Sequence, residues 1–501
     1  MSNGVTGLFF GELFDAASGS YKSYINGAWI RSCSSKVVTI TNPSTRKEEY
    51  KVQACTREEI DKAYEGCTEA QKIWRNVPLW KRADALRKVA GLLREQNETI
   101  ADFLVNEIAK ARKDSLSEVD RSADLIEYCA EEGVRLLSKG DFLTSDAFKG
   151  TERNKLCLSS RVPLGNVLCI PPFNYPVNLA VSKIAPALIS GNAVLVKPPT
   201  QGAVSGLHLA QVFHKSGLFP EGLVNFVTVR ASENGNYLAE HPSCHCLSFT
   251  GGDVGLGLAK RVGMIPVQME LGGKDACIVC DDADLDLAAK HIVKGGLSYS
   301  GQRCTAVKIV LVQQEVAEAL VDKVAAGVAK LTVGAPEDNA NITPVISETS
   351  ANFIEKLVTD AKEKGAKFLT DYRRDGNLIW PTLIDHVRPD MDLAWEEPFG
   401  PVLPIMRVKS VQEAVDHANK NRLALQACVF TQDVQKAIEI SDAVQAGTVQ
   451  INGAPARGPD HFPFQGFRDS GIGSQGIVNS IGMMTKTKTT VVNLTSPSYT
   501  V

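Results

Sequence analysis

Two residues of this chain have the surroundings that nucleophilic chemistry needs. Cys304 follows a Gly-Gln-Arg turn in SGQRCTA, which differs from the apolar surroundings of most other cysteines. A neighbouring cation and open backbone amides lower the pKa of a thiol, so we expect Cys304 to be largely a thiolate. Glu270 ends an apolar strand in MELGGKDA, where a carboxylate is either a satisfied strand-end residue or a general base. A third segment that stands out is PPFNYP at residues 171–176.

The elements that must position these residues alternate between strands and helices. After Arg161, helical stretches separate apolar runs of strand length, which are NVLCI, AVLVK, LVNFVTV, CLSFT, VQMEL and ACIVC. This alternation predicts βαβ units and a mostly parallel, buried sheet. The pattern repeats after Gly272, which predicts a second α/β domain. Residues 57–138 have the apolar spacing of amphipathic helices, and Asn26-Gly27 predicts a hairpin turn.

Composition excludes several classes of protein. The chain has 501 residues, with 54 Lys and Arg against 57 Asp and Glu, so its formal charge is −3. This balance gives no general reason to bind nucleic acid or a membrane, and an anionic ligand would need a local basic cluster. No apolar run approaches the ~20 residues of a membrane span. The N-terminal segment lacks the pattern of a secretory leader.

The 12 cysteines indicate a reducing compartment. They are scattered and stand mostly within apolar runs, which suits free thiols and a cytoplasmic location. Cys244-x-Cys246 and Cys277-x-x-Cys280 suggest zinc as an alternative, but both lie in or beside predicted buried strands and lack zinc-knuckle turns. We predict no metal site.

Several motifs together resemble the aldehyde dehydrogenase superfamily. ELGGK with Glu270 is followed 34 residues later by Cys304 of GQRC, and PFNYP, VKPPT, FTGG and EEPFGPV occur in the order that the family shows. The resemblance extends from about Tyr21 to the C-terminus. It implies an aldehyde dehydrogenase-like α/β fold with a Rossmann-type cofactor domain, an α/β catalytic domain and a small β oligomerisation element.

The resemblance also implies domain boundaries. They give a cofactor-binding domain at 20–143 and 161–272, a catalytic domain at 273–471, and an oligomerisation element at 144–160 and 484–501. Members of the family assemble as dimers or tetramers through this element, so we expect a homo-oligomer. The alternating tail TKTKTTVVNL has no obvious partner nearby, and we expect it to pair with a strand of another subunit.

Catalytic roles follow from the same resemblance. Cys304 attacks an aldehyde carbonyl, and Asn174 of PFNYP, together with the Cys304 backbone N–H, stabilises the oxyanion that forms. Expulsion of hydride to a nicotinamide leaves a thioester, and Glu270 activates the water that hydrolyses it. Lys183, two turns past the PFNYP loop, is interpreted as a packing residue or a helix charge.

Two residues favour NADP as the cofactor. Lys197 closes the strand AVLVK, where a cation can reach an adenosine ribose. Members of the family committed to NAD often have an acidic residue three positions later, whereas this chain has Thr200. A carboxylate there would repel a 2′-phosphate, so the pair predicts NADP. The alternative is that Thr200 merely caps the following helix.

Further cofactor contacts are implied at other strand ends. The phosphate loop departs from the family form F-T-G-S-T-x-x-G, because residues 249–255 read FTGGDVG and look one residue shorter. Asp253 adds a negative charge, and the backbone N–H groups of Gly251 and Gly252 remain as phosphate donors. The other residues implied to contact NADP are Glu397 at the nicotinamide ribose, Phe399 near the ring and Asn236 near the 2′-phosphate.

Three arginines indicate the substrate. With Tyr175, they resemble the non-phosphorylating glyceraldehyde-3-phosphate dehydrogenase branch of the family, and guanidinium forks suit a phosphate dianion. The substrate-binding residues implied are Arg121, Asn174, Tyr175, Arg303, Thr305 and Arg457. The activity implied is irreversible, NADP-dependent oxidation of glyceraldehyde 3-phosphate to 3-phosphoglycerate.

Alternatives to this activity stay open. A semialdehyde such as succinic semialdehyde also needs a cationic pocket, although one or two arginines satisfy a carboxylate. The arginines can instead be solvated or paired with Asp and Glu. A third hypothesis is a structural or binding role, but the intact Cys304, Glu270 and Asn174 argue against it.

Overall fold

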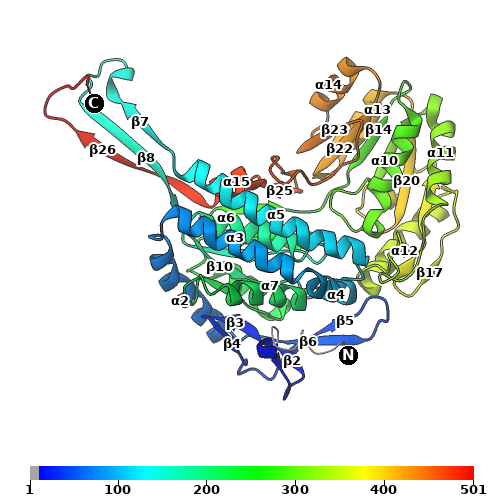
Figure 1. Ribbon diagram of the computed structural model, residues 1–501. Helices are drawn as coiled ribbons and strands as arrows, with labels where there is room; N and C mark the ends of the chain where they lie inside the picture. Colours follow the sequence, from blue (N-terminus) through cyan, green and yellow to red (C-terminus); the bar gives the residue numbers. More distant parts are fainter. Residues whose placement is uncertain (1–10, 501) are drawn as a thin grey trace.

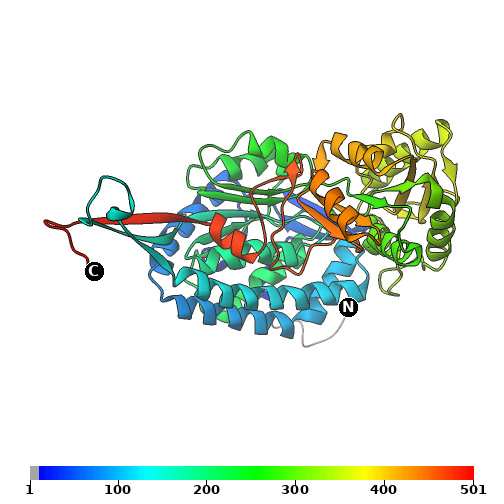
Figure 2. The same cartoon turned by 90° about the horizontal axis from the view of Figure 1, so that it is seen from above.

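The computed structural model describes residues 11–500 of the chain. Two α/β bodies stand side by side, each built on its own sheet, and a narrow antiparallel sheet projects from the first (Figure 1). Seen from above, this projection and the second body lie at opposite ends of the molecule (Figure 2). Residues 1–10 of the segment predicted to lack a leader, and residue 501 of the predicted oligomerisation element, lie outside the described residues.

The first body is built on an eight-stranded sheet. In sheet order the strands are β25 (Gly471–Ile472), β13 (Val267–Glu270), β12 (Cys246–Thr250), β9 (Asn166–Ile170), β10 (Ala193–Val196), β11 (Val224–Phe226), β3 (Ser23–Ile25) and β4 (Ala28–Ile30). The strands from β13 to β11 are parallel and largely buried, as their apolar runs predicted. Because parallel strands end at one edge of a sheet, the loops after β9, β10 and β13 are brought together there.

Helices pack on this sheet and on one another. They are α2 (Arg57–Trp74), α3 (Leu79–Glu95), α4 (Asn97–Ile108), α5 (Arg112–Leu137), α6 (Asn178–Ile189), α7 (Ala203–Ser216), α8 (Ala231–Glu240), α9 (Val254–Ala259) and α15 (Ile477–Met483). The long α5 packs on α6, and α3 packs on both α5 and α7 (Figure 1). Leu86, Val89 and Leu93 of α3 are buried at the spacing that predicted an amphipathic helix.

The predicted hairpin at Asn26-Gly27 is confirmed. β3 and β4 pair antiparallel, and the two turn residues have positive φ angles of 52° and 81°. The hairpin extends the large sheet beside β11. A neighbouring four-stranded sheet contains β1 (Phe14–Asp15), β2 (Ser20–Tyr21), β6 (Glu48–Gln53) and β5 (Val37–Thr41).

The second body is built on a seven-stranded sheet, as the repeated pattern after Gly272 predicted. Its strands in order are β16 (Lys367–Phe368), β19 (Thr382–Asp385), β20 (Val402–Val408), β15 (Ile309–Gln313), β14 (Ala276–Val279), β22 (Gln426–Phe430) and β23 (Thr448–Ile451). Its helices are α10 (Leu285–Leu297), α11 (Gln314–Val328), α12 (Glu348–Glu363), α13 (Val411–Lys420) and α14 (Val434–Ala443). Successive residues of β14 point to opposite faces of the sheet, so Cys277 and Ile278 belong to two different hydrophobic cores.

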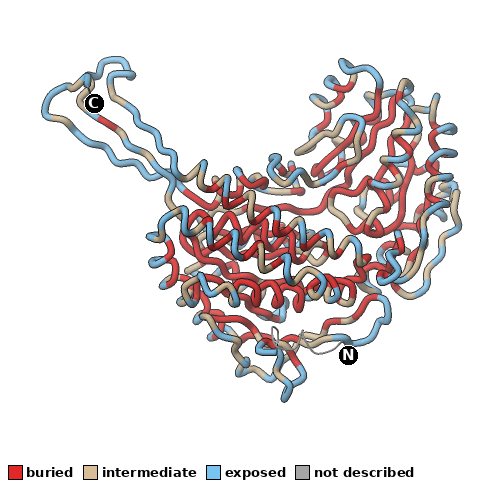
Figure 3. Tube along the Cα trace, viewed as in Figure 1, coloured by how far each residue is buried: buried red, intermediate tan, exposed pale blue. Residues whose placement is uncertain are grey.

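The projecting sheet has three antiparallel strands, β26 (Thr485–Asn493), β8 (Lys155–Pro163) and β7 (Gly140–Thr144). Most of its backbone is exposed or half-buried (Figure 3). The C-terminal tail, which has no obvious partner nearby in the sequence, pairs as β26 along its whole length with β8, and its pairing with another subunit stays a prediction. The local pattern could not reveal this partner, which lies more than 300 residues earlier in the sequence. No helix within residues 11–500 combines the length and apolarity needed to cross a membrane.

Candidate active site

The structure brings Cys304, Glu270 and Asn174 together. Glu270 ends β13, and Cys304 follows the short helix η3 (Ser298–Gly301). The Cys304 Sγ lies 3.5 Å from Glu270 Oε1. Asn174, in the loop between β9 and α6, donates from Nδ2 to the Gln302 carbonyl at 2.9 Å. The thiol, the carboxylate and the amide therefore lie at one place, although they come from three distant segments.

A strained turn carries the thiol. Tyr299 and Ser300 have φ angles of 52° and 54°, in the left-handed region that non-glycine residues rarely adopt. The Ser300 hydroxyl bonds both to the Thr343 carbonyl and to the Thr343 N–H, each at 2.8 Å. Lys308 donates to the Cys304 carbonyl. These contacts hold the turn that carries the thiol.

The expectation that Cys304 is a thiolate is wrong for the free protein. Burial raises the pKa of the Cys304 thiol well above its usual range, and the Glu270 carboxylate raises it further. Arg303, the cation expected to lower that pKa, points elsewhere and donates to the Gly295 carbonyl at 2.6 Å. The thiol is therefore protonated at neutral pH, and a base must take its proton before it can attack.

Glu270 has partners that suit a base. Its side chain is 1% exposed, and its Oε2 accepts hydrogen bonds from Arg457 and, at 3.4 Å, from the Thr250 hydroxyl. Lys183 donates to that hydroxyl at 2.7 Å. Burial lowers the pKa of Lys183 to about 8, although the charge of Glu270 counteracts this. The Thr250 hydroxyl thus links Lys183 to Glu270, and the interpretation of Lys183 as a packing residue or a helix charge stays a prediction.

The loop of Asn174 rests on a buried ion pair that the sequence did not reveal. Lys110 donates to the Asn174 carbonyl at 3.0 Å and pairs with Glu118 at 2.5 Å, both side chains being almost fully buried. Glu118 also accepts two backbone N–H groups at the start of α6. The Lys110 ammonium lies 3.5 Å from the centre of the Tyr175 ring. Nothing in the spacing of these residues marks them, because the contacts join separate segments.

The predicted arginines lie around this centre and already have partners. Arg457 bonds to Glu270 and, at 2.5 Å, to Gln475. Arg121, on α5, pairs with Asp460 at 3.1 Å, so it reaches the loop that carries Arg457. The alternative that the predicted arginines pair with Asp or Glu therefore holds for Arg121 and Arg457 in this structure. A ligand anion must take the place of those carboxylates.

Donors for an anion remain in the site. The Nε of Arg303 and the Nε2 of Gln475 are buried without a hydrogen-bond acceptor among the described residues. Such orphaned donors favour a polar or anionic ligand. Tyr175 is half-buried, with its ring 6.2 Å from that of Tyr299, and Thr305 is 3% exposed beside Cys304.

The residues predicted to select NADP lie at the end of β10. The half-buried Lys197 ammonium donates to the Pro198 carbonyl at 3.2 Å, and desolvation lowers its pKa to about 8. Thr200 is exposed and does not cap α7, because the N-cap is Gly202 and the Glu107 carboxylate accepts the first amides of that helix. The helix-cap alternative for Thr200 is therefore wrong. Lys197 is a cation without a carboxylate partner among residues 11–500, which suits a ribose or phosphate ligand.

The phosphate loop offers fewer donors than expected. The Gly251 N–H donates to the Glu270 carbonyl at 3.0 Å, so it is occupied by the sheet and is not available to a phosphate. Gly252 stands just before α9, and, apart from its two chain neighbours, no other residue lies within 4 Å of the place where a side chain would begin. The negative charge of Asp253 is balanced by Arg422, whose guanidinium lies 3.1 Å from the carboxylate.

Glu397 and Phe399 lie close to the nucleophile turn. Glu397 pairs with Lys308 at 2.9 Å, and Lys308 also holds the Cys304 carbonyl. The Phe399 ring packs edge-on against Phe173, with the ring centres 5.8 Å apart. The residues predicted to flank the nicotinamide therefore belong to the same cluster as the thiol.

Asn236 is exposed on α8. Glu233 on the same helix pairs with Lys36 at 2.7 Å and with Arg230 at 3.5 Å. Two cations therefore stand near the helix that carries Asn236.

The structure gives no cluster of metal ligands around the cysteine pairs that suggested zinc, as far as residues 11–500 are concerned. Within residues 11–500, no group of three or more His, Cys, Asp or Glu side chains is arranged to hold a metal ion. Cys277 and Cys280 belong to different hydrophobic cores.

Comparison with known proteins gives the class to which this fold and site belong. Residues 29–490 match the aldehyde dehydrogenase family, so the chain belongs to that family. The resemblance drawn from the motifs, and the fold that it implied, are confirmed.

Several members of the family are similar to this chain over nearly its whole length. The chain is 64% identical over 480 residues, covering 96% of this chain and 97% of the relative, to the NADP-dependent glyceraldehyde-3-phosphate dehydrogenase of Pisum sativum. It is 63% identical over 494 residues, 99% of each chain, to the protein of the same name from Arabidopsis thaliana. The crystal structure of the Bacillus halodurans C-125 enzyme of that name, complexed with NADP, superimposes with a TM-score of 0.93 at 48% identity, covering 95% of this chain and 99% of the other.

Proposed function

We propose that this protein is an NADP-dependent, non-phosphorylating glyceraldehyde-3-phosphate dehydrogenase. It oxidises glyceraldehyde 3-phosphate irreversibly to 3-phosphoglycerate, with water as the acyl acceptor. The observation that carries the proposal is the series of contacts from the Cys304 thiol through Glu270 to Arg457, because a guanidinium near the reacting sulfur suits a substrate with a phosphate group. The names of the close relatives support the same activity.

Acylation begins with the thiol proton. Glu270, 3.5 Å from the sulfur, accepts that proton, and the thiolate attacks the aldehyde carbon to form a tetrahedral thiohemiacetal. Asn174 and the Cys304 backbone N–H donate to the oxygen that becomes negative. Bound NADP⁺ would supply the hydride acceptor for this oxidation. After loss of the hydride, Cys304 holds the thioester of 3-phosphoglycerate.

Deacylation uses Glu270 a second time. After the proton from Cys304 has left Glu270 for solvent, the carboxylate takes a proton from water, and the hydroxide attacks the thioester carbonyl and expels the Cys304 thiolate, which takes the proton back from Glu270. Lys183, acting through Thr250, keeps one oxygen of Glu270 oriented. The product is a carboxylate, which the thiol cannot readily attack, so the overall reaction runs in one direction.

The residues at the end of β10 fit NADP. Within residues 11–500, the hydrogen-bond acceptor of Lys197 is one main-chain carbonyl, and position 200 is Thr and not an acidic residue that would repel a 2′-phosphate. Lys197, Thr200, Asn236, Gly252, Glu397 and Phe399 would hold the cofactor. In this proposal residues 20–143 and 161–272 form the cofactor-binding domain, and residues 273–471 form the catalytic domain.

The projecting sheet supports a homo-oligomer. Six apolar side chains of this sheet and its loop are exposed: Phe142, Leu143, Phe148, Leu158, Val491 and Val492. Exposed apolar groups on edge strands favour contact with another copy of the chain. We assign residues 144–160 and 484–501 to a dimer or tetramer interface. All twelve cysteines lie within residues 11–500 as free thiols, which supports a cytoplasmic location.

A spectrophotometric assay tests the proposed activity. Purified protein is mixed with glyceraldehyde 3-phosphate and NADP⁺ without inorganic phosphate, and NADPH is followed by its absorbance. We expect turnover in the absence of phosphate and none with Cys304→Ser. A higher kcat/KM for succinic semialdehyde than for glyceraldehyde 3-phosphate would favour the semialdehyde alternative. Cofactor binding without oxidation of any small aldehyde would favour a purely structural role.

A further inference from the structure

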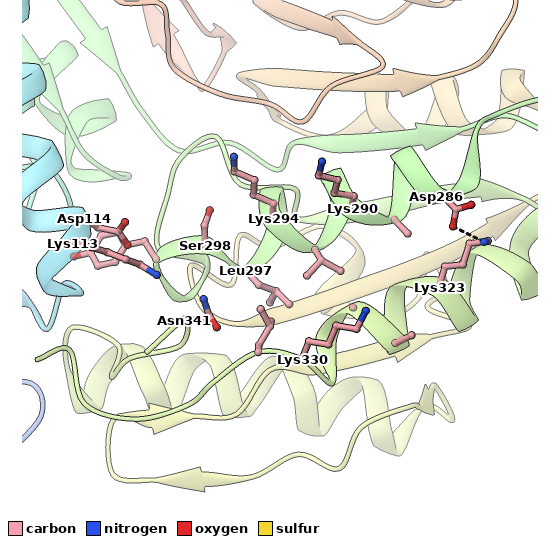
Figure 4. A pocket seen from close by; sticks show the side chains of 16 residues that line it. Lys113, Asp114, Asp286, Lys290, Lys294, Leu297, Ser298, Lys323, Lys330 and Asn341 are labelled. Carbon is pink, nitrogen blue, oxygen red and sulfur yellow. Dashed lines mark hydrogen bonds and ion pairs between the residues drawn. The ribbon is translucent and has the colours of Figure 1, made fainter. Parts of the chain in front are cut away.

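A cavity of about 630 Å³ lies apart from the reacting groups, where the start of α5 meets α10 and α11 (Figure 4). Side chains from these three helices surround it. Its lysines, which together with the cavity we call the lysine pocket, are Lys113, Lys290, Lys294, Lys323 and Lys330. Neither the chemistry proposed above nor the family motifs use any of them.

The charge of the lysine pocket is largely uncompensated. Lys323 pairs with Asp286 at 2.5 Å, and the other acidic residue on the wall is Asp114. Among residues 11–500, the other four lysines form no ion pair, because no carboxylate oxygen lies within 4.0 Å of their ammonium nitrogens. The whole chain, by contrast, has a formal charge of −3. All five lysines are exposed, and cations gathered around one concave surface give it a positive potential.

Two helices connect the lysine pocket to the candidate active site. Lys294 precedes Gly295, whose carbonyl accepts the Arg303 guanidinium at 2.6 Å. On α5, Arg121 follows Lys113 by eight residues, which is about 12 Å along a helix axis. Tyr299, from the turn that carries the nucleophile, lines the pocket as well. Three of the lysines, Lys113, Lys290 and Lys294, therefore stand on the two helices that carry or contact two of the proposed substrate arginines.

Lysine and arginine suit different steps of anion binding. An ammonium group is a hydrated point charge on a flexible stem, so it attracts an anion without fixing its orientation. A guanidinium offers paired, planar donors that hold a phosphate in one geometry. A substrate phosphate would first be attracted by the lysines outside the active site and then be held in one orientation by the arginines within it.

We propose that the lysine pocket is a binding site for small organic phosphates, which collects glyceraldehyde 3-phosphate before it reaches the arginines. The proposal rests on the function proposed above. It predicts a contribution to the rate of substrate capture, and therefore to kcat/KM, but none to the chemistry on Cys304.

Charge removal tests the pocket in the complete enzyme. The variant Lys290→Gln/Lys294→Gln/Lys330→Gln is compared with Lys88→Gln/Lys356→Gln/Lys409→Gln, which removes three exposed lysines elsewhere. At low ionic strength we expect the pocket variant to lose about tenfold in kcat/KM for glyceraldehyde 3-phosphate, within the range of electrostatic steering. Its kcat, and its kcat/KM for unphosphorylated glyceraldehyde, should stay unchanged. Its kcat/KM should also fall less steeply with added salt. Identical behaviour of the two triple variants would overturn the proposal.

A binding measurement separates this proposal from the proposed function. Inorganic pyrophosphate is titrated calorimetrically into Arg457→Leu protein, with and without the three pocket substitutions. We expect binding to persist in Arg457→Leu and to disappear when the three lysines are also replaced. Binding that is lost with Arg457→Leu alone, or that survives the lysine substitutions, would contradict the pocket. Absence of glyceraldehyde 3-phosphate oxidation would instead contradict the proposed function and leave the pyrophosphate result standing.

Discussion

The Arg457 side chain donates a hydrogen bond to Glu270, so the arginine proposed to bind substrate phosphate is also the ion-pair partner of the proposed base. The two side chains are 15% and 1% exposed, which makes this a largely desolvated pair. A phosphate dianion at Arg457 competes with Glu270 for the same guanidinium. Substrate binding is therefore expected to loosen Glu270 from Arg457 just when Glu270 must accept a proton.

Removing this guanidinium should distinguish phosphorylated from unphosphorylated aldehydes. Loss of one partner of a buried charge pair costs about 2–5 kcal/mol, so Arg457→Leu is expected to raise KM for glyceraldehyde 3-phosphate by about 30-fold or more. Glyceraldehyde, which has no phosphate, should be affected far less. Steady-state kinetics on both aldehydes measures the difference. Arg135→Leu, on the exposed face of α5, is the control. Equal losses on the two substrates would argue against a phosphate contact.

The protonated thiol gives a pH prediction. Burial and the Glu270 carboxylate raise the pKa of Cys304, so the rate of its alkylation by iodoacetamide should still be increasing at about pH 9. Glu270→Gln removes the negative neighbour and lowers that pKa. The variant should therefore be alkylated faster than the parent at pH 8, while its aldehyde oxidation is lost. Mass spectrometry of the modified peptide follows the reaction. A rate that levels off below pH 7 would show a thiolate instead.

Cofactor choice should respond to a single carboxylate. Thr200 is exposed three residues after Lys197, where a negative charge would face a 2′-phosphate. Thr200→Glu is expected to raise KM for NADP⁺ about tenfold or more and to leave KM for NAD⁺ nearly unchanged. Thr200→Val, which removes the hydroxyl without adding charge, should change both constants little. If Thr200→Glu weakened NAD⁺ and NADP⁺ alike, residue 200 would have no part in selecting between them.

The sequence was sufficient to predict those parts of the fold that follow from a local residue pattern and a general rule of protein structure. The strand-length runs before Lys197 and at Glu270 predicted a parallel sheet, and parallel strands bring their ends to one edge. The two residues of the Asn26-Gly27 turn have the positive φ angles that their types predict.

Contacts between distant segments were beyond reach of such patterns. The Lys110 ammonium supports Asn174 across 64 residues of sequence, and neither position is distinctive by itself. The protonated state of Cys304 depends on burial, which the exposed-looking Gly-Gln-Arg turn does not reveal. The sequence predicted that the Gly251 N–H is available to a phosphate. The register of β12 against β13 instead places the Glu270 carbonyl at that N–H, and this register cannot be read from the local sequence.

Lys183 should leave a signature in the pH dependence of stability. Its pKa in the folded protein is about 8, below the ordinary value of 10.5, because burial disfavours the ammonium. Between these values the unfolded chain binds more protons than the native protein, so this group makes the free energy of unfolding rise as pH increases from 8 toward 10.5. Below about pH 8 both states are protonated, and the burial penalty, on the order of 3 kcal/mol, is constant. Lys183→Met is therefore expected to be more stable than the parent at pH 7, apart from the lost bond to Thr250, and to show a smaller rise in stability up to pH 10. Denaturant unfolding at several pH values measures this, with the exposed Lys88→Met as control. A slope equal to that of the parent would mean that Lys183 keeps its ordinary pKa in the folded protein.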